Sequence, residues 1–572
     1  MNAVRERRVT FLRSALALAT LLAATVASAD DFRIDDAAVS SPLASYKARR
    51  IEFSGSKLSR ESVQRLLAAD DKTGGSDRFA QIDADRISIP ELIAETRAQD
   101  YAQTVTYRDL ILSDVAKGVA RRVEIGGAEV DSRRSGSSSK GHLGAMRLEG
   151  VDFPALLRLT YAARASADEP KRITTRAFAM AGAQIEIEGG GKVTVGEIGG
   201  RDFGGRPLAA PLGGLIEATP KLDATEPSPE ARRAIAAMTA DLLASMDVGA
   251  IEARDLRFVA PGVEQAPGVE LQMRRMALEG LADGRIAQLV VEGVASNQPE
   301  ARFALDRIAL SGLDLTASLK AAAAPAGGPA APRFDRIDIA GVSASGPDGP
   351  VSAAGVSIAA SDWLAVAPTK LSARIDRLSV SLAGAGAGRN AALAALGYDK
   401  VEVSGGLEAK FDPAKGELSV DKIEADSAQV GRVAASLMLS RIPVAAFSGD
   451  WEAARSAWPS ILFWRTDLAV MDKGLIGRIA QVQAAKAGAS ETQARARLAQ
   501  TARALVHSLF AAAPKSDAQV DGLADAVAAV ATGAPTLDVR IWAPDGMGLV
   551  DFALAAQLGT LSRALKIEAK AR

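Results

Sequence analysis

Apolar and polar residues alternate one by one along most of the chain after its first thirty residues. Val401, Val403, Leu407, Ala409 and Phe411, for example, are separated by charged, small polar or glycine residues. A two-residue period is that of a β-strand with one buried face. The pattern therefore predicts a mainly β protein whose strands each present one apolar face.

A short element with a glycine recurs within this pattern. Two alternating apolar positions are followed by one further residue, a glycine and an aliphatic residue. The clearer copies are 146–151, 276–281, 308–313 and 337–342, and the looser copies are 51–55 and 289–294. Glycine inside a strand marks a bulge, a bend or a close approach of two backbones. Because the copies are irregularly spaced, they predict a meandering sheet with loops of varied length rather than a solenoid.

The alternation also slips by one residue at four acid-base pairs. The pairs are Asp306-Arg307, Asp335-Arg336, Asp376-Arg377 and Asp421-Lys422, each preceded by an apolar residue and followed by apolar alternation in the opposite phase. A β-bulge changes the phase in this way and keeps the same face buried, and a tight connection between two strands is the alternative. Repeated bulges predict a strongly curved sheet, and the charges are interpreted as outward groups that protect its edges.

Helical spacing appears in a few segments. Ser228-Pro229 predicts a helix start, and Gly249 its end. Three further helices are expected between Leu475 and Gly533, the second opened by a capping box of Ser490 and Gln493. Strands are expected to return at 537–541, 549–554 and 565–569.

These elements define the predicted fold class and domains. The fold class is mainly β, with a long curved antiparallel sheet, forming either a groove or a sandwich, and an α-helical C-terminal portion (α+β overall). The domains are a leader at 1–29, a β-rich region at 30–222, a repetitive β-rich region at 223–440 opened by a helix, and a helical segment with closing strands at 441–572.

The first 29 residues have the pattern of a signal peptide. Four arginines between Arg5 and Arg13 precede an apolar run at 15–27, which ends in Ala27-Ser28-Ala29. The run is short for a membrane span, and the small residues suit signal peptidase, so we expect export to the periplasm; an uncleaved N-terminal anchor is the alternative. No later stretch is apolar for long enough to span a membrane. The mature chain is therefore expected not to cross the membrane.

Composition narrows the chemistry that the chain can perform. It has no cysteine, only two histidines and a net charge of −1. Zinc sites, cysteine nucleophiles and most histidine-assisted triads are therefore not expected, and nucleic acid is an unsuitable partner. His142 lies in a Ser/Gly-rich segment expected to be a loop, and the glycines at 189–191 are interpreted as a turn because the segment lacks the residues of a phosphate loop. We expect no enzyme activity, no cofactor and no metal.

One segment is unusually rich in aromatic residues. Trp451, Trp458, Phe463 and Trp464 fall within fourteen residues. Such a cluster forms a core that joins helices to a sheet, or an exposed tip that contacts a membrane or a partner, because tryptophan favours such interfaces. These four residues are the candidate site residues of the sequence.

Single-faced strands, the recurring glycine element and the leader together resemble the repetitive β-proteins of Gram-negative envelopes. Over residues 86–440 the chain is similar in texture to AsmA-like proteins and related periplasmic families. That resemblance implies a sheet folded into a groove with an apolar interior, and a role in lipid transport or outer-membrane homeostasis. The chain differs from those families in its helical C-terminal portion and in having no evident membrane anchor.

Three functional hypotheses follow. The first is an exported, non-enzymatic envelope protein whose apolar sheet face binds lipid or an envelope partner. The second is a structural or assembly scaffold with a closed, dry core. The third is a hydrolase that uses carboxylates alone.

Overall fold

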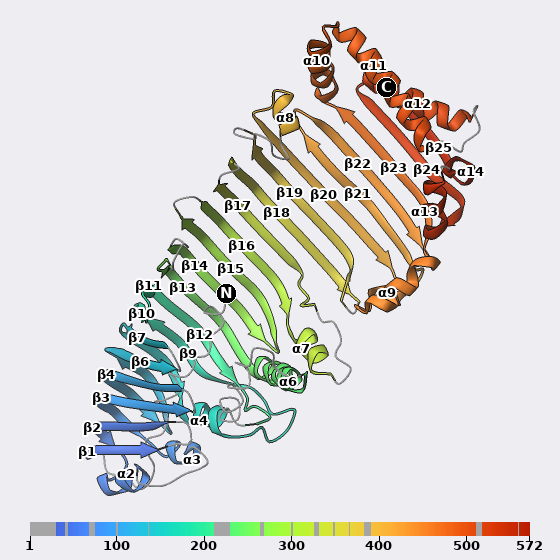
Figure 1. Cartoon of the computed structure of the whole chain (residues 1–572). Helices are drawn as coiled ribbons and strands as arrows, with labels where there is room; N and C mark the ends of the chain where they lie inside the picture. The colour runs from blue at the N-terminus through green and yellow to red at the C-terminus, as the bar shows by residue number, and fades with distance from the viewer. Residues whose placement is uncertain are drawn as a thin grey trace. The chain divides into compact units, whose positions relative to one another are not determined.

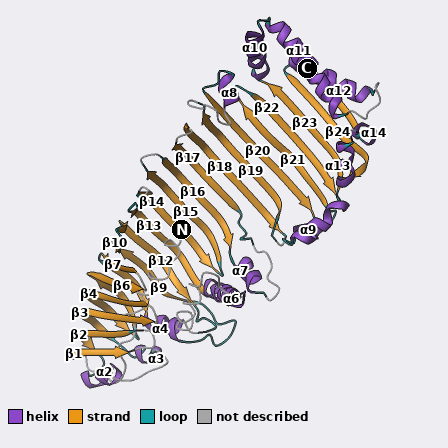
Figure 2. Cartoon of the chain, viewed as in Figure 1, coloured by secondary structure: helices purple, strands orange, loops and turns teal. Residues whose placement is uncertain are grey.

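The structure is a computed structural model that describes residues 30–572 apart from short segments. The segments outside the description are 41–43, 68–74, 99–100, 135–136, 211–228, 263–267, 299–300, 325–330, 347–348, 365, 383–390, 511–516 and 559. The predicted leader and the domain boundary expected between 222 and 223 lie outside the described residues. Strands form 56% of the chain and helices 26%, the helices mostly in the C-terminal part, and the strands pair antiparallel, so the predicted fold class is confirmed (Figures 1 and 2).

The chain divides into two compact units, each described here by itself. The N-terminal unit comprises residues 1–298 and 312–327, and the C-terminal unit comprises residues 299–311 and 328–572. The division therefore falls inside the 223–440 region of the sequence-based scheme.

The N-terminal unit contains fifteen strands and five helices among its described residues. The strands are β1 (Asp30–Ser40), β2 (Ser45–Ser56), β3 (Ala84–Ala98), β4 (Tyr101–Ala116), β5 (Val119–Ile125), β6 (Gly127–Arg134), β7 (Ser137–Leu143), β8 (Met146–Asp152), β9 (Arg172–Met180), β10 (Ala183–Ile187), β11 (Gly191–Val195), β12 (Glu197–Gly205), β13 (Met246–Ala260), β14 (Val269–Ala282) and β15 (Arg285–Asn297). The helices are α2 (Arg60–Leu67), α3 (Ser76–Phe79), α4 (Phe153–Tyr161), α6 (Pro229–Ser245) and α7 (Thr316–Ala323).

The C-terminal unit contains the remaining strands and helices. The strands are β16 (Arg302–Asp314, whose last residues belong to the other unit), β17 (Arg336–Gly346), β18 (Gly349–Trp363), β19 (Pro368–Ser381), β20 (Lys400–Asp412), β21 (Glu417–Ser427), β22 (Gly431–Ser440), β23 (Leu462–Asp472), β24 (Thr536–Gly548) and β25 (Lys566–Ala571). The helices are α8 (Ala391–Ala395), η3 (Val444–Phe447), α9 (Trp451–Ala457), η4 (Trp458–Ser460), α10 (Leu475–Ala487), α11 (Glu491–Leu509), α12 (Ala518–Thr532), α13 (Leu549–Gln557) and α14 (Leu561–Ala564).

Long strands of the N-terminal unit are interrupted at the same level. β4 pairs with β6 along one half and with β5 along the other, and Gly126 lies between those two partners. Similar interruptions follow in the next strands as far as β13, which pairs with β12 on one side of Asp255 and with β11 on the other. Ladder pairs are missing at this level from β1 to β15, so the interruptions form one transverse crease.

Residues with positive φ lie along this crease. They include Asp36, Asp109, Asp255 and Gly293, with φ between 52° and 64°. The left-handed backbone region is accessible to glycine and, more readily than to most residues, to aspartate. At this level the apolar phase changes: Tyr107 and Leu110 of β4, three residues apart, are both buried in the same core. The crease thus bends the sheet and keeps one face apolar.

The recurring glycine element behaves as the sequence predicts. Its six glycines, Gly55, Gly150, Gly280, Gly293, Gly312 and Gly341, all have φ between 60° and 66°. Each marks a bend within or at the end of a strand, which confirms the prediction of a local departure from regular strand geometry.

The four acid-base slips have three different outcomes. Register shifts accompany Asp376-Arg377 and Asp421-Lys422, which confirms two bulges. Asp306 lies in register opposite Gly341, so the phase change there is shared by both strands and adds no extra residue to either. The bulge predicted at Asp335-Arg336 is wrong, because Asp335 precedes β17 and its carbonyl accepts a hydrogen bond from Ala360 at the strand start.

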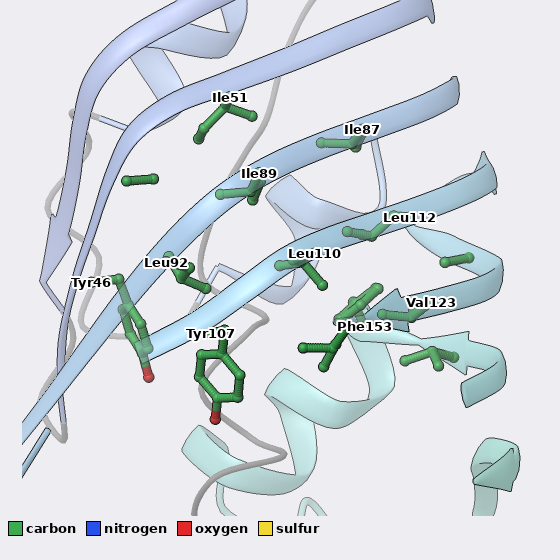
Figure 3. Close-up of a cluster of buried hydrophobic side chains, with 14 of the residues drawn as sticks. Tyr46, Ile51, Ile87, Ile89, Leu92, Tyr107, Leu110, Leu112, Val123 and Phe153 are labelled. Atoms are coloured by element: carbon green, nitrogen blue, oxygen red, sulfur yellow. The ribbon is translucent and has the colours of Figure 1, made fainter. Parts of the chain in front are cut away.

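A dense core lies in the first half of the N-terminal unit. Ile51, Val63 and Leu110 are fully buried, and Phe153 at the start of α4 packs among them. Figure 3 shows side chains of successive curved strands directed into one interior, with Phe153 entering from α4. Asp152 caps α4 by accepting a hydrogen bond from the Ala155 N–H at 2.9 Å. This part of the molecule is closed and apolar inside.

The predicted helices are largely confirmed, and three local predictions are wrong. α6 begins at Pro229, and Ser490 and Gln493 form the expected capping box of α11. The helix end predicted at Gly249 is wrong, because α6 ends at Ser245 and Gly249 lies in strand β13, which pairs with β12 and β14. The strand predicted at 549–554 is instead helix α13, because this alanine- and leucine-rich segment favours a helix and packs one side onto the sheet. His142 lies in strand β7 rather than in a loop, because the segment pairs with β6 and β10. Gly189 and Gly190 lie in the predicted turn between β10 and β11, and Gly191 is the first residue of β11.

Candidate functional site

One face of the C-terminal unit is apolar in rows that cross its strands. Cross-strand partners lie on the same face of a sheet, so the ladder identifies the rows. They are Leu305–Val342–Ala353–Leu378–Val403, Ile308–Ile339–Val356–Ile375–Gly405 and Leu407–Ile423–Ala435–Leu468–Val539. We call this surface the apolar face. It continues across nine strands because the phase change at Asp306, Gly341 and Arg377 returns apolar side chains to the same side.

The apolar face is covered only at its margins by the described elements. α12 packs on Leu537, Val539 and Ile567 near the C-terminal edge, and α13 and η3 pack at one end of the strands. Over the middle of β17–β22 Figure 1 shows no helix. Ile423 and Val433 there are each 44% exposed, whereas Ile51 in the N-terminal unit is 0% exposed. Strands of the same pattern therefore enclose a core in the first half of the N-terminal unit and leave an apolar surface open in the C-terminal unit.

The opposite face of the same strands carries ion pairs, and we call it the ionic face. Arg336 and Asp338 lie 2.7 Å apart, Arg374 and Asp376 2.8 Å apart, and Arg465 and Asp467 2.7 Å apart. Partners two residues apart on one strand share a face, so β17, β19 and β23 each bear an exposed pair of their own. The sheet of the C-terminal unit is thus apolar on one face and charged on the other.

Carboxyl groups on the ionic face have lowered pKa values. A hydrogen bond from Arg336 lowers the pKa of Asp338, and a hydrogen bond from Arg432 lowers that of Glu424. Burial raises the pKa of Asp467, but hydrogen bonds from Arg465 and Arg540 outweigh it, and the net shift is downward. These carboxyl groups are therefore ionised at neutral pH, and the ionic face is a charged, hydrated surface.

The aromatic cluster is divided between interior and surface. Trp451 and Trp458 are 68% and 58% exposed, on α9 and at the start of η4. Phe463 on β23 is buried and packs against Phe552 of α13, with ring centroids 5.3 Å apart. Trp464 is half-buried, and its indole N–H donates to the Ser440 hydroxyl. The two sequence interpretations therefore each describe half of the cluster.

Four further exposed residues accompany Trp451 and Trp458. We define the tip surface as Val444, Trp451, Trp458, Val550, Leu554 and Leu558, which are 47–68% exposed. Their elements are in contact in the order η3, α9, η4 and α13. The Leu549 N–H also donates to the Ile461 carbonyl at 3.0 Å, which fixes the start of α13 beside the end of η4. Figure 1 shows α9 and α13 at the same end of the strands.

Helix α13 is apolar on two sides. Leu549, Phe552 and Ala555 face the sheet, whereas Val550 and Leu554 are exposed one turn apart. This exposed stripe differs from the sequence prediction, which expects a strand at 549–554. The signal was the four-residue spacing of Val550, Leu554 and Leu558, which is helical.

Other chemistry in the described part of the chain is sparse. A depression of about 490 Å³ in the N-terminal unit lies along the crease and is lined by Asp109, Glu124, Arg147 and Glu197, among others. Glu124 and Glu197 are in ion pairs with arginines, at 3.8 and 3.5 Å. Among the described residues, no three acids or histidines lie together as a metal site would require. In the same residues, no helix has the length and apolar character needed to span a bilayer.

Comparison with known proteins is limited to the C-terminal part. A family model with the description "Uncharacterized protein" matches residues 424–572, which contain the tip surface, β22–β25 and the helices α10–α12. Neither the curated proteins nor the solved structures include a match to the chain.

Proposed function

We propose that the protein is an exported, non-enzymatic envelope protein that binds lipid acyl chains on the apolar face of its C-terminal unit. The single observation that carries this proposal is the continuity of apolar rows across β16–β24, with side chains up to 44% exposed. A sheet with one apolar face needs a covering layer, and the described elements supply one only at the margins. Exposed apolar surface of this kind commonly marks a binding site.

The energetics suit an extended chain rather than a compact ligand. Burying one methylene contributes about 0.8 kcal/mol, so about ten methylenes along the face would contribute about 8 kcal/mol. That exceeds the lower estimates of the association cost, about 4 kcal/mol. The rows that define the face consist of aliphatic residues and one glycine, so we propose that the acyl chain, and not the head group, is recognised.

The leader and the sequence texture support the proposed location. Residues 1–29 have the pattern of an export signal. The resemblance to AsmA-like proteins, which rests on the texture of residues 86–440, supports a place in the Gram-negative envelope. We propose the periplasm, with no cofactor.

A scaffold role is the second candidate, and it is favoured by the N-terminal unit. The closed core there, which includes Ile51, Val63 and Leu110, leaves little room for a ligand. In this version the N-terminal unit is a rigid support, and the open face of the other unit binds a protein partner in place of lipid.

Mass spectrometry of organic-solvent extracts tests the proposal. Lipid should be extracted from the purified protein, and Val433→Glu should reduce it several-fold by placing a charge on the apolar face. Met438→Glu is the matched control, because Met438 lies on the same strand, is 41% exposed and belongs to the opposite face. Extracts free of lipid, or equal losses in both variants, would contradict the proposal and favour the scaffold role.

A further inference from the structure

We infer that the tip surface docks on the interfacial region of a zwitterionic lipid bilayer. This inference goes beyond the proposed function and stands without it, because the tip surface and the open rows of the apolar face are formed by different residues. Its evidence lies in the composition, arrangement and charge of four small elements at one end of the sheet.

The first step is that both tryptophans project from the same side of their segment. Trp451 and Trp458 are seven residues apart across α9 and the start of η4, a spacing that returns to the same side of a helix. Both are more than half exposed, although tryptophan is ordinarily among the more buried residues. Indole is enriched where an apolar phase meets water.

The second step is that α13 adds an aliphatic stripe next to them. Val550, Leu554 and Leu558 are 55%, 53% and 58% exposed at four-residue intervals. The inner side of the same helix is anchored by Phe552 against Phe463. A surface helix normally exposes polar residues on its outer side, so this outer stripe has the character of an interfacial helix.

The third step concerns the charged residues in the segments of the tip surface, because their net charge determines which kind of membrane they complement. Segment 441–460 contains two arginines and two acids, and segment 544–566 contains two basic residues and two acids. A rim with both signs and no net charge complements a layer of zwitterionic head groups. It offers no cationic patch that would select an anionic membrane.

The fourth step is that the tip surface is too small for a stable interface with another protein or a second copy of the chain. Standard protein interfaces engage about 20–30 residues on each partner. The tip surface has six apolar residues, which is small for a stable dimer but suits reversible insertion into a bilayer interface. We therefore assign a bilayer, and not a second copy of the chain, as the occupant.

Flotation of the full-length protein with phosphatidylcholine vesicles tests the inference. The protein should float, and Leu554→Ser/Leu558→Ser should reduce its partitioning by about tenfold or more. Leu505→Ser/Leu509→Ser is the matched control, because these two leucines are also four residues apart on a helix and are 60% and 61% exposed. All variants share the same N-terminus, so an uncleaved leader would affect them equally.

Tryptophan emission provides an independent readout. Vesicles should shift the emission to shorter wavelength, and brominated lipids should quench it; both effects should be lost in Trp451→Phe/Trp458→Phe. Partitioning should change little between low and high salt, because the rim has no net charge.

Three outcomes would overturn the inference. They are equal flotation of the leucine pairs, binding that requires anionic lipid and disappears in salt, and dimerisation that is lost only in the tip variants. Failure here is distinguishable from failure of the proposed function, because Val433→Glu should lose extracted lipid and still float.

Discussion

The bend at Gly341 offers a quantitative test of how the sheet keeps one face apolar. Gly341 has φ of 61° and lies opposite Asp306. A Cβ atom added there would lie 1.9 Å from Oδ2 of Asp306 and 2.7 Å from its Cβ. Gly341→Ala therefore combines left-handed strain of about 1–2 kcal/mol with displacement of the Asp306 side chain, for a total loss of about 2–3 kcal/mol.

Gly346→Ala on the same strand is the matched control. Gly346 does not have positive φ, and an added Cβ would have no neighbour within 4 Å. Its replacement should be neutral or stabilise the protein by up to about 1 kcal/mol, because alanine restricts the unfolded chain.

Urea unfolding followed by tryptophan emission measures this difference. All five tryptophans, Trp363, Trp451, Trp458, Trp464 and Trp542, belong to the C-terminal unit, so the signal reports on the unit that contains the bend. Gly341→Ala should lower the free energy of unfolding by at least about 2 kcal/mol relative to Gly346→Ala. Equal stability of the two variants would refute the reasoning that the left-handed residue sets the bend.

Two further predictions concern the ionic face and the sheet edge. The pKa of Asp467 is lowered in the folded state, so its ionised carboxylate stabilises the fold above about pH 4, and this stabilisation is lost as the pH falls. Between pH 6 and 3, the free energy of unfolding measured in urea should therefore fall less in Asp467→Asn than in the wild type, by a difference of less than about 1 kcal/mol. Gln519 accepts a hydrogen bond from the Ile567 N–H of β25 at 2.9 Å. Gln519→Ala should therefore lower the free energy of unfolding by about 1 kcal/mol and, because it frees a backbone donor at the sheet edge, increase self-association in sedimentation. Gln519→Glu keeps an acceptor and should do neither. Steeper acid sensitivity in Asp467→Asn, or association in Gln519→Glu, would contradict them.

Most of the fold could be predicted from the sequence, because the period of the apolar residues shows which face of a strand is buried. Alternation identified strands such as β20, and glycine spacing located bends such as those at Gly150 and Gly280. It did not show that the bends align across strands, because alignment depends on pairing register between distant segments. Pairs of polar residues at 35–36 and 108–109 lie on the crease of the N-terminal unit and are a sequence signal of it.

The candidate site was predicted only in part, for a physical reason. Aromatic density located the segment that contains Trp451 and Trp458, but composition cannot distinguish a tryptophan that anchors a core from one that remains exposed. Phe463 on β23 packs inward and Trp464 beside it is half-buried, whereas Trp451 and Trp458 lie on short helices beyond the strand end. Val550 and Leu554 were missed because a short apolar run fits a strand and a helix equally well.

Photo-crosslinking from the apolar face tests the central claim most directly. A photoreactive residue placed at Val433 would project from the apolar face, and one at Met438 would project from the ionic face of the same strand. The proposal predicts a lipid-mass adduct at position 433 and none at position 438 when cells that express the protein are irradiated. A protein adduct alone at position 433, or lipid adducts of equal yield at both positions, would contradict it.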